Sequence, residues 1–169
     1  MIETPSIKTQ RLLLRQVELG DAEAVYSWTG DIEVCRYLFY LPNRDLETTE
    51  RIVANWVKKR RHFAWLLVLD GTPIGEFEII KNLPEKGFEI GYEMAKAYWG
   101  HGYMSEAAKA ILSFMKEKGY AYAYAETDGR NESSLRLLAK LGFEVIGEED
   151  RLIEKTGAEI RVKKLRKML

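Results

Sequence analysis

The chain has 169 residues, of which 46% are hydrophobic and 31% charged, a composition typical of a globular protein with one core. Its 26 basic and 26 acidic residues cancel, so no global field favours nucleic acid or an anionic membrane as a partner. The one cysteine, Cys35, excludes an internal disulfide and fits a reducing compartment. We expect a single domain over residues 1–169, which forms a monomer or a homodimer. We expect it to be cytoplasmic, because Met1–Gln10 lacks the apolar core of a signal peptide.

The first third of the chain predicts one strand and two helices. Residues Arg11–Val17 predict the strand, and Asp21 and Asp45 stand where helix N-caps belong. The second helix ends in the basic run Lys58–Arg61, which we interpret as a solvated last turn, with a nucleic-acid patch as the alternative. Apolar residues recur at helical spacing at Ala24, Val25 and Trp28, and at Ile52, Val53 and Trp56.

The middle of the chain predicts a β meander. Three apolar runs, Phe63–Leu69, Ile74–Ile80 and Phe88–Met94, have the length and composition of strands. Turn residues separate them, at Asp70-Gly71 and between Pro84 and Gly87. The sequence therefore predicts three antiparallel strands at the centre of a sheet.

The rest of the chain alternates helices and strands. Tyr103–Lys118 predicts a helix, Tyr120–Thr127 a strand, and Asn131–Lys140 a second helix capped by Asn131. A final hairpin follows, with its turn at Thr156-Gly157. The order predicts a mixed α/β fold with a mostly antiparallel sheet and helices on both faces. It differs from a doubly wound dinucleotide fold, because strands and helices alternate only between the last strand of the meander and the final hairpin.

Two helix starts, each after a central strand, carry the candidate chemistry. The first is the turn Tyr98–Glu106, where Gly100 and Gly102 let the backbone approach a bulky ligand. Its backbone N–H groups lie at the positive end of a helix dipole, which makes the turn a candidate anion cradle, with a plain tight turn as the alternative. The second start is Thr127–Ser134, which leads into a helix that ends near Gly142.

These two segments resemble the acetyl-CoA-dependent N-acetyltransferase superfamily known as GNAT, and the likeness covers nearly the whole chain. The glycine turn, Asn131 with Ser134, and the run Lys140-Leu141-Gly142-Phe143 carry it. The segments Thr9–Arg15 and Glu89–Tyr92 resemble the branch that contains the ribosomal-protein N-terminal acetyltransferases. Two positions depart from the family pattern. Ala97 stands where Arg or Gln is usual, which removes one polar side chain near the diphosphate. His101 stands where Lys or Arg is common, which removes one fixed positive charge there.

The resemblance implies a sheet splayed between its central strands, Phe88–Met94 and Tyr120–Thr127, with the pantetheine arm of acetyl-CoA in the opening. It implies that backbone groups bind the arm and polarise the thioester carbonyl, and that amides of the glycine turn hold the diphosphate. No metal is expected, since His62 and His101 form no ligand cluster. The residues implied in cofactor binding are Tyr92, Met94, Ala95, Trp99, Gly100, His101, Gly102, Tyr103, Met104 and Asn131.

Ser134 and Glu126 are the candidate catalytic residues. Ser134 lies one helical turn after Asn131 and would protonate the departing sulfur. In some relatives a tyrosine does this, but the corresponding position here is Leu138. Glu126 is the candidate general base, with Glu93, Glu89 or a water as rivals. Ser134 has a plain structural role as its alternative, and each glutamate a role as an exposed strand carboxylate or ion-pair partner.

The acceptor is expected to be a primary amine. Neutralising an α-amine of pKa about 8 at pH 7 costs about 1.4 kcal/mol, against about 4.6 for a lysine-like amine of pKa about 10.4. This favours a peptide or ribosomal-protein N-terminal α-amine over a small amine such as a polyamine or aminoglycoside. A non-catalytic acetyl-CoA-binding module is a further alternative. Arg36, Tyr37, Tyr40 and the last hairpin are the candidate acceptor-binding residues.

Overall fold

The computed structural model describes residues 4–59 and 64–169. Three features of the sequence interpretation lie wholly or partly outside these residues: the end of the basic run at Arg60 and Arg61, His62, and Phe63 at the start of the predicted meander. No helix in the described part of the chain has the length and apolar character needed to cross a membrane.

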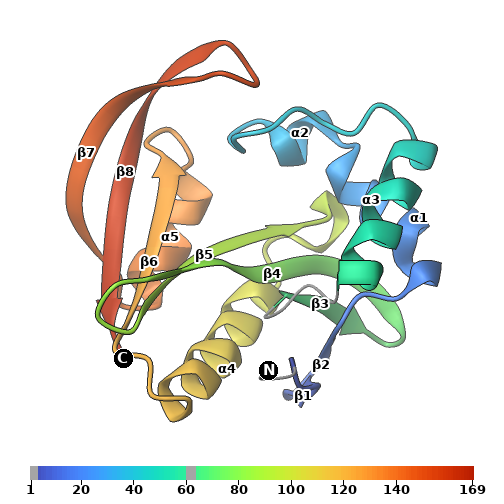
Figure 1. Ribbon diagram of the computed structural model, residues 1–169, viewed down its shortest axis with the longest axis horizontal. Helices are drawn as coiled ribbons and strands as arrows, with labels where there is room; N and C mark the ends of the chain where they lie inside the picture. The colour runs from blue at the N-terminus through green and yellow to red at the C-terminus, as the bar shows by residue number, and fades with distance from the viewer. Residues whose placement is uncertain (1–3, 60–63) are drawn as a thin grey trace.

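Eight strands form one open sheet in the order β1-β2-β3-β4-β5-β6-β8-β7 (Figure 1). Every neighbouring pair is antiparallel except β5 and β6, which run parallel. The predicted mixed, mostly antiparallel sheet is therefore confirmed, including the central meander β3–β4–β5. The strands are β1 (Ile7–Lys8), β2 (Leu12–Arg15), β3 (Ala64–Leu69), β4 (Thr72–Leu83), β5 (Gly87–Met94), β6 (Tyr122–Asp128), β7 (Glu144–Ile153) and β8 (Ala158–Met168).

Helices cover both faces of the sheet, as predicted. Because side chains alternate along a strand, Leu66 and Val68 of β3 pack against α1 and α3, while Trp65 and Leu67 join the core under α4 (Figure 1). The helices are α1 (Ala22–Thr29), α2 (Ile32–Cys35), α3 (Leu46–Lys59), α4 (Tyr103–Glu117) and α5 (Glu132–Lys140), with short 3-10 turns η1 (Leu19–Asp21) and η2 (Lys96–Tyr98).

Two of the three predicted helix caps are confirmed. Asp45 accepts the Thr48 N–H at 2.8 Å, and Asn131 accepts the Ser134 N–H at 3.1 Å. The prediction that the Asp21 carboxylate caps α1 is wrong, although Asp21 is the N-cap residue. Its oxygens instead accept hydrogen bonds from Arg15 at 2.7 and 2.8 Å, because a buried carboxylate is stabilised more by a guanidinium than by one amide.

The splay predicted between the central strands is present. Strands β5 and β6 pair over only four positions, from Gly87 opposite Tyr122 to Ile90 opposite Ala125. Beyond Ile90 the last residues of β5 pair with β4 but not with β6, and Figure 1 shows the two strands leading away from each other. One edge of β5 is therefore open toward the space between the strands, which we call the β5–β6 gap.

Candidate active site

The backbone of β5 presents polar groups to the β5–β6 gap. The Ala95 N–H donates to Ile74 O at 2.9 Å, which fixes the direction of the alternating backbone groups along β5. The N–H groups of Tyr92 and Met94 accordingly point to the gap side, where β6 does not pair with them. Of the predicted backbone contacts, Tyr92 and Met94 thus fit a ligand in the gap. Ala95 does not fit, because its N–H is bonded to Ile74 and its carbonyl accepts the Tyr98 N–H.

The glycine turn has the geometry of an anion cradle. Gly100 and Gly102 have φ values of +81° and +80°, in the left-handed region that glycine enters without strain. Gly102 is the N-cap of α4, and no side chain caps this helix start. The first N–H groups of α4, those of Tyr103 and Met104 among them, therefore face outward at the positive end of the helix dipole.

Contacts from neighbouring segments hold this turn in place. The Trp99 indole donates to the Met94 carbonyl oxygen at 2.7 Å, which ties the turn to the end of β5. The guanidinium of Arg11 donates to the His101 carbonyl oxygen at 3.0 Å and lies 4.4 Å from the centre of the Tyr103 ring. Arg11 also pairs with Glu106 at 2.7 Å. Sequence reasoning assigned no role to Arg11.

Ser134 meets Tyr92 across the β5–β6 gap. The hydroxyl oxygen of Ser134 lies 2.7 Å from the phenol oxygen of Tyr92, so α5 and β5 are joined by one side-chain hydrogen bond. Asn131 holds the backbone of Ser134 through its capping carbonyl oxygen. Burial raises the pKa of Tyr92 to about 12. The three residues that the sequence placed near the cofactor arm are thus brought together.

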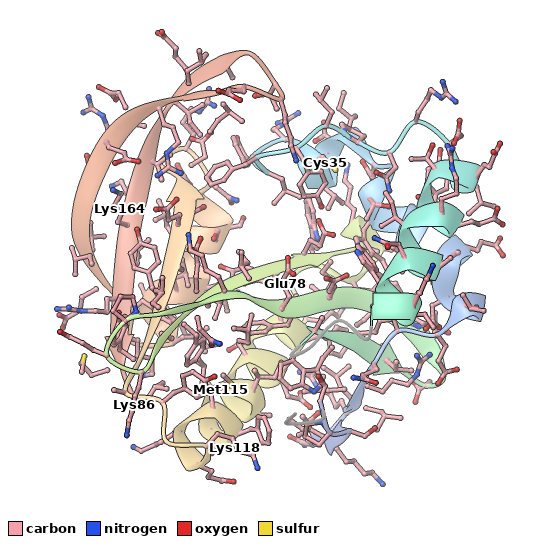
Figure 2. The ribbon with its side chains drawn as sticks, in the orientation of Figure 1. Cys35, Glu78, Lys86, Met115, Lys118 and Lys164 are labelled. Atoms are coloured by element: carbon pink, nitrogen blue, oxygen red, sulfur yellow. The ribbon has the colours of Figure 1, made fainter. Side chains whose placement is uncertain are left out.

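A pocket of about 760 Å³ lies at the open end of the gap. Among its described lining residues are five glutamates and one lysine, Lys155. Figure 2 shows Glu78 on β4, on the side that faces the β7–β8 hairpin and the segment after α2. The glutamates are Glu76, Glu78, Glu89, Glu93 and Glu126. Sequence reasoning missed Glu76 and Glu78, since nothing local shows that alternate residues of β4 and β5 share one face.

In Figure 1 the tip of the β7–β8 hairpin and the segment after α2 lie on the same side of the sheet. Phe39 packs against the buried hairpin residues Ile153, Ile160 and Val162. Two of the candidate acceptor-binding residues, Tyr37 and Tyr40, line the pocket. Arg36 is not among the described residues that line it, and its exposed guanidinium pairs with Glu33 at 2.6 Å, so its role in acceptor binding stays a prediction.

The carboxylate of Glu126 has two engaged oxygens. One accepts the Tyr124 phenol at 2.7 Å and the other accepts Arg151 at 2.6 Å. Burial acts to raise the pKa of Glu126, but the hydrogen bonds and the Arg151 charge outweigh it, so the pKa lies below its usual value. A carboxylate held in this way is a weak proton acceptor.

Two other predicted groups have different surroundings. Glu93 of β5 accepts a hydrogen bond from the Tyr40 phenol and lies opposite Glu76 of β4 in the ladder. Glu89 pairs with Lys81 at 2.8 Å.

Cys35, labelled in Figure 2, is buried, and burial raises the pKa of its thiol to about 12, which makes it an unreactive core residue. No group of three or more histidine, cysteine, aspartate or glutamate side chains within residues 4–59 and 64–169 suits a metal ion.

Comparisons with known proteins agree with this geometry. A family model described as an acetyltransferase (GNAT) domain matches residues 11–144. The uncharacterized N-acetyltransferase YnaD of Bacillus subtilis is 31% identical over 138 residues, which are 81% of each chain. The spermidine N(1)-acetyltransferase of Escherichia coli is 25% identical over 137 residues, covering 80% of this chain and 74% of that protein.

Solved structures show the same fold. The crystal structure of a GNAT-family acetyltransferase from Bacillus anthracis matches with a TM-score of 0.87 at 27% identity, covering 97% of this chain and 98% of that one. RimL, a ribosomal-protein α-N-acetyltransferase solved with coenzyme A, matches with a TM-score of 0.85 at 18% identity, covering 98% of each chain. At that identity the likeness to the ribosomal-protein branch extends to the fold alone. The chain belongs to the GNAT acetyltransferase family and is an N-acetyltransferase.

Proposed function

We propose that the chain, as one domain, transfers the acetyl group of acetyl-CoA to a small primary amine that carries a second positive charge. The observation that carries this proposal is the pocket at the end of the β5–β6 gap, whose described lining includes five glutamates and one lysine, with Glu126 and Glu89 ion-paired to Arg151 and Lys81. Carboxylates concentrated in a cleft attract a cationic ligand more strongly than they would in open water. The relative that acetylates spermidine acts on an amine of this class.

The placement of acetyl-CoA follows from the open backbone groups. Tyr92 and Met94 offer N–H groups on the gap side of β5, which suit the amide groups of the pantetheine arm and the thioester carbonyl. The side-chain amide of Asn131 lies at the opposite wall. The diphosphate suits the uncapped start of α4. The residues proposed to surround it are Trp99, Gly100, His101, Gly102, Tyr103 and Met104.

The two faces of β5 separate the steps of the reaction. Successive side chains of a strand point to opposite faces, so Glu93 and Tyr92 approach the gap from different sides. The amine enters from the glutamate side and its nitrogen forms a bond to the thioester carbon. The Met94 N–H stabilises the negative oxygen, and Ser134 gives its proton to the sulfur as the carbon–sulfur bond breaks. Solvent then returns a proton to the serine oxygen and takes the one that Glu93 removed from the amine. Attack and departure thus occur on opposite sides of the acyl group.

We propose Glu93 as the group that takes the proton of the amine. The assignment to Glu126 stays a prediction, and its contacts with Arg151 and Tyr124 count against it. A base is needed because the acidic pocket that attracts an ammonium group also stabilises its charged form. Glu93 lies opposite Glu76 in the β4–β5 ladder, on the acceptor side of the gap, and accepts a hydrogen bond from the Tyr40 phenol.

A panel of acceptors tests the proposed substrate class. We expect turnover, read as thiol release, with polyamines and short diamines, and a KM for diamines that rises with ionic strength as the charge attraction is screened. A monoamine of the same length serves as the control and should react more weakly. A peptide with a neutral side chain at its first residue is the second candidate, since Tyr37 and Tyr40 suit an apolar chain. If such peptides react best, the small-amine proposal is wrong.

Replacing Ser134 by alanine should lower kcat by about 100-fold, the usual range for loss of a positioned acid. The affinity for coenzyme A should stay unchanged, because the Ser134 backbone N–H keeps its bond to Asn131. Steady-state kinetics and calorimetric titration with coenzyme A measure the two quantities. Full turnover by Ser134→Ala would remove the acid role from this residue.

Replacing Glu126 by glutamine should leave the pH dependence of kcat/KM unchanged while reducing stability. Since the folded-state pKa of Glu126 is below its usual value, its ion pair with Arg151 stabilises the fold above that usual value. This contribution, about 1 kcal/mol, is lost as pH falls through the folded pKa. Denaturant unfolding of both proteins at neutral and acid pH measures the difference. Loss of the acidic limb of the rate profile would instead make Glu126 the base.

A further inference from the structure

We infer that the side chain of Tyr92 is a positioning residue for the acid step: its phenol donates a hydrogen bond to Ser134 and turns the serine hydroxyl hydrogen toward the departing sulfur. The inference rests on the proposed function, in which Ser134 is the acid. It gives Tyr92 a role beyond the backbone contacts already assigned to it. The argument depends on where the two hydroxyl groups lie and on which of them donates.

The geometry fixes Ser134 at two points. Its backbone N–H donates to Asn131 at 3.1 Å, and its hydroxyl oxygen lies 2.7 Å from that of Tyr92. These contacts come from the cap of α5 and from β5, on different sides of the gap. A serine side chain otherwise rotates among three staggered positions. The contact with Tyr92 selects one rotamer before the ligand arrives.

The phenol is the better donor of this pair. A phenol is far more acidic than an aliphatic hydroxyl group, so in a hydrogen bond between the two the phenol preferentially gives the proton. Burial raises the pKa of Tyr92 to about 12, so that the phenol keeps its hydrogen across the working pH range. When Ser134 accepts this bond, its own hydrogen is left for an acceptor in the pocket, and the leaving sulfur is one.

The ring of Tyr92 is held independently of its hydroxyl group. It stacks on Phe77 with the ring centres 6.0 Å apart and the planes at 12°, and Phe77 is fully buried. Phe77 lies opposite Tyr92 in the β4–β5 ladder. Replacing Tyr92 by phenylalanine therefore removes one hydroxyl group and leaves the ring in its packing. This makes the variant a clean test of the hydrogen bond.

The test compares wild type, Tyr92→Phe, Ser134→Ala and the double variant, with acetyl-CoA and an amine that wild type turns over. We expect Tyr92→Phe to lower kcat by about 10-fold, a part of the loss typical for a positioned acid. The KM for acetyl-CoA and the affinity for coenzyme A should not change. The double variant should match Ser134→Ala alone, because a residue that acts through another adds nothing once the other is gone.

Tyr122→Phe is the matched control, because this phenol donates to the Pro84 carbonyl oxygen at 3.1 Å and lies outside the pocket. It should keep full activity. Full kcat in Tyr92→Phe, additive losses in the double variant, or weakened coenzyme A binding in Tyr92→Phe would each overturn the inference while leaving the proposed function in place. An active wild type is the test of that function: no turnover with any amine would overturn both.

Discussion

Replacing Gly102 by valine is expected to abolish acetyl-CoA binding. Gly102 is the N-cap of α4 with φ +80°, a conformation that a β-branched residue adopts only with strain. The added side chain would also stand where the diphosphate approaches the first N–H groups of the helix. We expect the Kd for coenzyme A to rise at least 100-fold, which is about 2.7 kcal/mol. Calorimetric titration of the purified variant measures it.

Gly71→Val is the matched control for this experiment. Gly71 has nearly the same φ, +83°, but lies in the turn between β3 and β4 with no atom within 4 Å of an added side chain. The control carries a similar backbone strain and should lose stability without losing affinity. If Gly102→Val binds coenzyme A as tightly as Gly71→Val does, the glycine turn is not the diphosphate site.

Replacing Glu93 by glutamine is expected to lower kcat/KM for a diamine by at least about 100-fold, the range for loss of a general base. The change is isosteric, so the Tyr40 phenol keeps an oxygen to donate to. Two effects combine: the amine loses a proton acceptor, and the pocket loses one of its five lining carboxylates. The acidic limb of the pH–rate profile should disappear, since rate rises with pH only while a base is being deprotonated.

Glu23→Gln, an exposed position on α1, serves as the control and should keep the wild-type profile. The KM for acetyl-CoA should be the same in both variants, because Glu93 lies on the acceptor side of the gap. An unchanged profile in Glu93→Gln, together with a changed one in Glu126→Gln, would move the base to Glu126. An unchanged profile in both would leave a water as the proton acceptor.

Features set by neighbouring residues were predictable from the sequence. The glycine turn before Tyr103 and the cap at Asn131 are local, because each depends on the backbone needs of one helix start. The meander was predictable for the same reason, as turn residues separate its apolar runs. The sequence did not predict the short elements β1 and α2, because segments of two and four residues carry no periodic signal.

Features that depend on distant contacts were not predictable. Arg11 donates a hydrogen bond to the glycine turn although the two lie 90 residues apart in the sequence, so neither segment alone predicts this contact. Arg151 of β7 pairs with Glu126, which lowers the pKa of a carboxylate that the sequence placed well for a general base. The acidic face of the pocket arises from the register of β4 and β5, in which Glu76 lies opposite Glu93. Such register is set by the packing of the whole sheet.

A crystal structure of the protein with coenzyme A tests the central claim most directly. The account predicts that the pantetheine arm lies in the β5–β6 gap, with its amides bonded to the backbone of Tyr92 and Met94, and that the diphosphate contacts the N–H groups from Gly100 to Met104. A coenzyme bound elsewhere, with β5 and β6 closed against each other beyond Ile90, would contradict it.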